Sequence, residues 1–197
     1  MPETICDSPS TTYILHGGRS SSGSHESRAF FEEIIKRSQY PLRLLLAYFA
    51  RPEEQWGAVF ERDRQSFQNI AAQGAIEITL ASKQRDEFAR QLVEATAIYL
   101  SGGKTKGLKD MLQTVPNLAD AFRGKVVAGS SAGVHALCRY YYNRAADQID
   151  RGLGIIPVKV ICHYSGNSQK ALERLVSTGE ASQVVTIPEE QFVILSF

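Results

Sequence analysis

The sequence predicts an α/β fold, a three-layer α/β/α sandwich in which helices cover both faces of a mostly parallel central sheet. Short apolar runs alternate with segments of helical periodicity through the first 140 residues. This alternation is typical of parallel strands joined by crossover helices, because each helix carries the chain back across the sheet. The 197 residues are enough for one such domain with a buried core. We therefore expect a single domain over 1–197, with residues 1–11 as a loose leader.

The expected elements follow from hydrophobic spacing and from the Gly and Pro residues at their ends. Phe30, Phe31, Ile34 and Ile35 have helical spacing, and Gly74 is a plausible C-cap for the second helix. Strands are expected at 13–16, 42–49, 75–80, 95–100, 125–129, 155–163, 184–187 and 192–195, the last two as a hairpin. Helices are expected at 25–38, 55–73, 84–94, 108–115, 117–122, from 132, and at 168–177.

Composition excludes several classes of protein. The formal net charge is +1, which gives no support to binding of nucleic acid or of an anionic membrane. There is no apolar run of 18 residues or more, and the polar N-terminus lacks a signal-peptide pattern. Cys6, Cys138 and Cys162 form an odd set without C-x-x-C spacing, which argues against a disulfide framework or a zinc site. We expect a cytoplasmic protein with no nucleic-acid or membrane partner.

A candidate nucleophile lies between the strand at 125–129 and the helix from 132. Gly129-Ser130-Ser131-Ala132-Gly133 has the form G-x-S-x-G, the pattern of a nucleophile elbow. In such an elbow a serine occupies a cramped strand-to-helix turn, and small neighbours leave room for the turn. The hydroxyl then projects from the sheet edge beside free N–H groups. The pattern therefore indicates Ser131 as a nucleophile.

A serine nucleophile needs a base within hydrogen-bond reach. His163 ends an apolar strand, where a parallel sheet gathers its functional side chains. His135 is a weaker alternative, since an elbow serine projects away from its own helix, and His16 is a further weak alternative. The third member should be a carboxylate between serine and histidine in the chain, which leaves Asp147 and Asp150 as candidates.

An oxyanion needs N–H donors beside the nucleophile. The turn Gly102-Gly103 follows the strand at 95–100, and Ala132 follows Ser131 directly. We therefore expect backbone N–H groups of Gly102, Gly103 and Ala132 to form an oxyanion hole. Neither a phosphate-binding loop nor a metal-ligand pattern is present, so no cofactor and no metal are expected.

Three blocks in order resemble the peptidase E / cyanophycinase family of serine peptidases. They are Ile98-Tyr99-Leu100-Ser101-Gly102-Gly103-Lys104-Thr105, Gly129-Ser130-Ser131-Ala132-Gly133-Val134, and Gly152-Leu153-Gly154-Ile155-Ile156-Pro157 leading to Cys162-His163-Tyr164. The resemblance covers about residues 10–195 and implies a class I glutamine amidotransferase-like fold. It matches Ser131 to the family nucleophile and His163 to its histidine. It matches Gly102 and Gly103 to the oxyanion turn. The family acid is an Asp or Glu downstream of the elbow, which Asp147 matches best by distance, with Asp150 left open.

The resemblance also implies a substrate class. Peptidase E cleaves dipeptides with an N-terminal aspartate, and cyanophycinase cleaves β-aspartyl-arginine. Lys104 stands where the family turn usually has Asn, and His135 stands where Ala or Asn is usual. Arg19, Lys104 and Arg139 could each attract an acidic substrate, although a plain surface charge is the more common role for each.

The sequence thus predicts a serine peptidase, dipeptidase-like, that hydrolyses a small peptide, an aspartyl peptide included. The predicted catalytic triad is Ser131, His163 and Asp147. An amidase or esterase on the same elbow is one alternative. A catalytically impaired, amidotransferase-like binding module is another. The oligomeric state stays open, a homodimer included.

Overall fold

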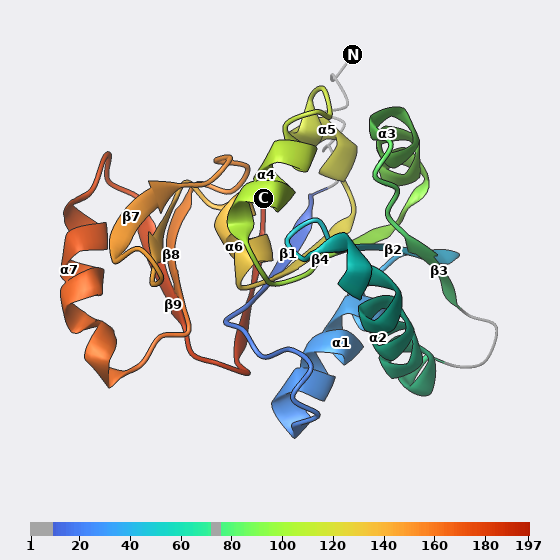
Figure 1. Ribbon diagram of the computed structural model, residues 1–197, viewed down its shortest axis with the longest axis horizontal. Coiled ribbons are helices and arrows are strands. Elements are labelled where there is room, and N and C mark those ends of the chain that lie inside the picture. Colours follow the sequence, from blue (N-terminus) through green and yellow to red (C-terminus); the bar gives the residue numbers. More distant parts are fainter. Residues whose placement is uncertain (1–9, 72–75) are drawn as a thin grey trace, which may run out of the picture.

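The computed structural model describes residues 10–71 and 76–197. Its larger sheet has six strands in the order β10-β1-β5-β4-β2-β3 (Figure 1). All neighbours are parallel except β10, which runs antiparallel to β1. The expected α/β fold with a mostly parallel central sheet is confirmed. The strands are β1 Thr12–His16, β2 Leu42–Ala47, β3 Ile76–Leu80, β4 Ala97–Leu100, β5 Val126–Ser130 and β10 Phe192–Ser196.

Helices cover both faces of this sheet and give three layers (Figure 1). Successive strand residues point to opposite faces, so Ile14 belongs to one core and Leu15 to the other. The core around Ile14 includes apolar residues of α1 (His25–Arg37) and α2 (Trp56–Ile70). The core around Leu15 includes residues of α3 Arg85–Glu94, α4 Thr105–Leu112, α5 Leu118–Phe122 and α6 Ala132–Leu137.

A second sheet of four strands lies at one end of the molecule, in the order β7-β6-β8-β9 (Figure 1). Helix α7 (Gln169–Ser177) packs on it through Ala171 and Leu175. Strands β6 and β7 are antiparallel, whereas β8 is parallel to both β6 and β9. The strands are β6 Tyr140–Asn143, β7 Gln148–Arg151, β8 Val158–Cys162 and β9 Gln183–Ile187. Two short 3-10 turns, Glu53–Gln55 and Gly166–Ser168, complete the elements.

Two expectations about this region are wrong. No strand is expected between 129 and 155, but residues 140–151 form the β6–β7 hairpin. Tyrosines favour strands, and α6 already ends at Leu137. The strands at 184–187 and 192–195 do not form a hairpin, because β9 pairs with β8 and β10 pairs with β1. The connection 188–191 therefore crosses from one sheet to the other.

Some expected boundaries also shift. The backbone N–H of Thr11 donates to the carbonyl of Phe197 at 2.8 Å, and Thr11 is buried, so it is not part of a loose leader. The rest of the expected leader, residues 1–9, and the expected Gly74 cap lie outside the described residues. Within the described ranges, no helix combines the length and the apolar character needed to cross a membrane.

Gly133 tests the packing of α6 on the sheet. A Cβ there would lie 2.2 Å from the carbonyl oxygen of Leu100 in β4. We expect Gly133→Ala to lower the free energy of unfolding by about 1–3 kcal/mol, because the helix must move off the strand. The control is Gly57→Ala in the exposed part of α2, where a Cβ meets nothing within 4 Å. That change should raise stability by about 0.5–1 kcal/mol. Denaturant unfolding of both variants checks the pair, and equal effects would contradict this packing.

Candidate active site

Ser131 occupies a strained turn between β5 and α6. Its backbone has φ 48° and ψ −99°, which is costly for a residue with a side chain. The flanking glycines permit the turn, since a Cβ on Gly129 would lie 2.8 Å from the carbonyl carbon of Gly133. The backbone N–H of Ser131 donates to the carbonyl of His16 at 3.0 Å, which ties the turn to the end of β1. The local geometry is that of the expected elbow.

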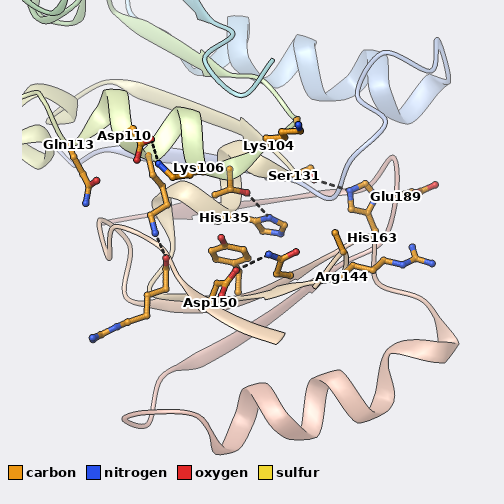
Figure 2. A pocket seen from close by; sticks show the side chains of 17 residues that line it. Lys104, Lys106, Asp110, Gln113, Ser131, His135, Arg144, Asp150, His163 and Glu189 are labelled. Atoms are coloured by element: carbon orange, nitrogen blue, oxygen red, sulfur yellow. Dashed lines mark hydrogen bonds and ion pairs between the residues drawn. The ribbon is translucent and has the colours of Figure 1, made fainter. Parts of the chain in front are cut away.

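His163 follows β8 and faces Ser131 from the second sheet. Ser131 Oγ and His163 Nε2 are 2.8 Å apart, and His163 Nδ1 is 2.9 Å from Glu189 Oε1 (Figure 2). A hydrogen bond from His163, with a further one from Arg19, lowers the pKa of the Glu189 carboxyl below its usual value. An ionised carboxylate only accepts, so Nδ1 donates to Glu189, and Nε2 is left to accept the Ser131 hydroxyl. Ser131, His163 and Glu189 thus form a chain of two hydrogen bonds.

The expected acid, Asp147, does not lie at His163. It is exposed in the turn of the β6–β7 hairpin, where it accepts bonds from Tyr142 at 3.0 Å and Arg174 at 2.8 Å. The alternative, Asp150, accepts from Asn143 at 2.8 Å and from Gln148 at 2.7 Å. Because 140–151 folds as a hairpin of the second sheet, both carboxylates bind partners in that hairpin, and Asp147 also binds Arg174 of α7.

Glu189 takes the position at His163 that was expected for an aspartate. The sequence does not indicate Glu189, because its pattern predicts an acid between Ser131 and His163 and a hairpin at 184–195. The connection 188–191 passes between the two sheets and brings Glu189 to His163, which follows β8. The remaining signal was a pair of adjacent acids, Glu189 and Glu190, between two apolar strands.

The turn Gly102-Gly103 packs beside the elbow. A Cβ on Gly102 would lie 3.6 Å from Cβ of Ser131. Gly103 has φ +147°, and a Cβ there would fall 2.2 Å from the carbonyl oxygen of Ala50, so both the conformation and the space require glycine. Ala132 is buried at the start of α6. The structure therefore brings the three expected oxyanion residues next to Ser131.

These residues open into a groove of about 1040 Å³ between α4 and the β6–β7 hairpin. In Figure 2, Ser131, His163 and Glu189 lie toward one end of the groove, and Lys106, Asp110 and Gln113 lie toward the other. Its lining is basic in balance, with the cations Lys104, Lys106, Lys109, Arg144 and Arg151 against the acids Asp110, Asp150 and Glu189. An anionic ligand is therefore favoured over a cationic one.

His135 lines the groove, but its ring does not bond to the Ser131 hydroxyl. Its ring stacks on Tyr141 with 4.3 Å between centroids, and Nδ1 is 3.5 Å from Thr105 Oγ1. Burial lowers the pKa of His135 to about 3, so the ring is neutral. His16, the other alternative base, is fully buried at the end of β1. The Ser131 hydroxyl bonds to the ring of His163, and not to the ring of His135 or of His16.

The remaining expected residues play other parts. Arg19 pairs with Glu189 at 3.4 Å and with Glu190 at 3.8 Å, whereas Arg139 pairs with Glu180 and is not part of the groove lining. Cys138 and Cys162 are buried free thiols, and burial raises the pKa of both. Among the residues that the structure describes, no group of three His, Cys, Asp or Glu side chains could hold a metal ion.

A serine on an elbow, bonded to histidine and through it to a carboxylate, is typical of hydrolytic enzymes with α/β folds. The family model "Peptidase family S51" matches residues 14–196 of this chain. The chain therefore belongs to peptidase family S51.

Solved structures of other proteins have a fold similar to that of this chain. A peptidase from an acI-B1 Actinobacterium has a TM-score of 0.70 and 21% sequence identity, over 94% of this chain and 84% of that one. A putative peptidase E protein from Listeria monocytogenes EGD-e has a TM-score of 0.64 and 15% identity, over 95% of both chains. Among curated proteins, no sequence matches.

The neutral histidines predict a pH dependence of stability. Burial lowers the pKa of His16 to about 4 and that of His135 to about 3, both below the ordinary 6.5. The unfolded chain therefore binds more protons below pH 6.5, and stability falls as pH decreases from 6.5 toward 4. Between pH 6.5 and pH 5, each of these two histidines should lower the free energy of unfolding by about 2 kcal/mol. Denaturant titrations should show a flatter pH dependence in His135→Asn than in the wild type. Equal slopes in the wild type and His135→Asn would refute this assignment.

Proposed function

We propose that this member of peptidase family S51 is a serine peptidase. In this proposal Ser131 is the nucleophile, His163 is the general base, and Glu189 orients the imidazole. The observation that carries the proposal is the pair of contacts at His163, 2.8 Å to Ser131 Oγ and 2.9 Å to Glu189 Oε1. A hydroxyl so placed can pass its proton to Nε2 while Nδ1–H stays bound to the carboxylate.

The steps follow from this geometry. Ser131 Oγ attacks the peptide carbonyl carbon as His163 Nε2 takes its proton. The resulting oxyanion accepts hydrogen bonds from the N–H groups of Ala132 and of the Gly102-Gly103 turn. His163 then gives the proton to the leaving amine, and an acyl-enzyme forms. Water, deprotonated by His163, attacks the acyl-enzyme and releases the carboxylic acid product with Ser131 restored.

The role of Glu189 is tested against Asp147 by removing one negative charge at each position. Glu189→Gln should slow the reaction with a fluorophosphonate about 10²–10⁴-fold, because the imidazole loses the partner that fixes its tautomer. Asp147→Asn, in the exposed hairpin turn, should react at the wild-type rate. Ser131→Ala should not be labelled at all while keeping its fold by circular dichroism. An Asp147→Asn variant that reacts as slowly as Glu189→Gln would contradict the role of Glu189 as the residue that orients His163.

We further propose that the substrate is a small acidic peptide, an aspartyl dipeptide included. Lys104 and Arg144 line the groove, and in the described part of the chain neither makes an ion pair. By contrast, Lys106 is bound to Asp110 at 2.6 Å. Two uncommitted cations on the groove that Ser131 opens into support recognition of a substrate carboxylate.

The charge preference is measured by comparing Asp-X with Asn-X peptides. Lys104→Gln and Arg144→Gln should each lower kcat/KM for the Asp-X peptide about 5- to 30-fold, the range from an exposed ion pair to a charge-assisted hydrogen bond. The Asn-X peptide should be little affected. Lys170→Gln on α7, outside the groove lining, is the control for a change in net charge. Equal losses on both peptides would contradict an acidic subsite.

Two alternatives are separated by the same assays. An esterase or amidase would cleave simple esters or amides in preference to Asp-X peptides. A catalytically impaired binding module would leave Ser131 unmodified by the fluorophosphonate. The hydrogen bond between His163 and Glu189 weighs against the second alternative, because it gives the imidazole a carboxylate partner.

A further inference from the structure

The turn His16-Gly17-Gly18 at the end of β1 touches all three segments that carry Ser131, His163 and Glu189. The backbone N–H of Ser131 donates to the carbonyl of His16 at 3.0 Å, and that of His163 donates to Gly17 at 2.9 Å. The N–H of Glu190 donates to the carbonyl of Gly18 at 2.9 Å. Each of these bonds fixes one segment against the same short turn.

The two glycines let these segments approach closely. Gly18 has φ +126°, and a Cβ there would lie 2.1 Å from Cε1 of His163. A Cβ on Gly17 would lie 2.0 Å from the carbonyl oxygen of Pro188, in the connection that carries Glu189. The turn is therefore closely packed against the His163 imidazole and against the connection 188–191 that carries Glu189. A displacement of the turn would move both.

The side chain of His16 holds this turn from within. It is fully buried, and its ring packs on Phe30 with 4.6 Å between centroids. Nδ1 accepts the backbone N–H of Gly18 at 3.1 Å. A backbone N–H can only donate, so Nδ1 carries the lone pair and Nε2 carries the proton. Burial, which lowers the pKa of His16 to about 4, keeps this neutral form at neutral pH.

Packing alone does not account for a histidine at this position. In the described structure Nε2 of His16 is buried without a hydrogen-bond partner, which costs stability. An apolar side chain would fill the space beside Phe30 without that cost. What it would lack is an acceptor for the N–H of Gly18, in a turn whose other polar groups bind the three segments of the site.

We infer that His16 is a positioning residue for this site, one that acts by holding the Gly17-Gly18 turn against which His163 and the Glu189 connection are aligned. This inference rests on the proposed serine chemistry. His16 itself does not touch the reacting atoms, since the Ser131 hydroxyl bonds to His163.

The test compares His16→Asn with His16→Leu. These side chains have nearly the same shape, and both leave the same space beside Phe30. Oδ1 of asparagine lies one bond from Cγ, as Nδ1 of histidine does, so it can accept the Gly18 N–H, whereas leucine cannot. The readout is the rate of labelling by a fluorophosphonate, with the thermal midpoint measured in parallel. His16→Leu should react about tenfold more slowly or worse, and His16→Asn within about threefold of the wild type, although both lose ring packing.

Each outcome decides a different point. A folded wild type that is not labelled would refute the proposed function, and the inference with it. A labelled wild type with an equally fast His16→Leu would overturn the inference alone. Equal slowing in both variants would also overturn it, because the loss would then belong to the ring and not to its acceptor. If His16→Leu does not fold, His16→Gln replaces it, since its amide lies one bond too far out to occupy the Nδ1 position.

Discussion

The hydrogen bond between Ser131 Oγ and His163 Nε2 joins two different sheets, and the geometry of the site depends on it. Ser131 follows β5 of the six-stranded sheet, whereas His163 follows β8 of the four-stranded sheet. In the proposed function, neither sheet alone holds the nucleophile together with its base. The proposed function therefore constrains how the two sheets are placed relative to one another, and it also constrains the connections between them.

The connection between β9 and β10 links the two sheets directly. It leaves the second sheet after Ile187, passes the strand ends where Glu189 meets His163, and joins the first sheet at Phe192. Its backbone is bonded to the end of β1 at Gly17 and Gly18. Glu189 therefore lies on the segment that links the two sheets, at the point where Ser131 and His163 meet.

The three histidines near the site have different electrostatic surroundings. His16 and His135 are neutral because burial disfavours their charged forms. His163 alone among them has a carboxylate partner, Glu189, which is itself exposed and also bound by Arg19. An imidazolium formed during a reaction would thus be stabilised at only one of these three positions.

Local sequence patterns predicted the parts of this site that local structure determines. The elbow at Ser131, the Gly102-Gly103 turn and the strand that ends at His163 each depend on a few consecutive residues. The position of Glu189 could not be predicted in this way, because it depends on which sheet β9 and β10 each join. Two short apolar strands separated by four residues fit a hairpin as well as they fit two sheets. Likewise, the tyrosines of β6 gave no indication of their partner strand, so Asp147 was placed near a histidine that it does not contact.

The central claim is that one particular hydroxyl, that of Ser131, is the activated one. Tandem mass spectrometry of the fluorophosphonate-treated protein tests this directly, because trypsin releases residues 126–139 as a single peptide with Ser130 and Ser131 side by side. Ser130 is buried in β5 as the residue opposite His16, whereas Ser131 opens into the groove. The adduct should lie on Ser131 alone. An adduct on Ser130 or on a serine elsewhere, or no adduct on the folded protein, would contradict the account.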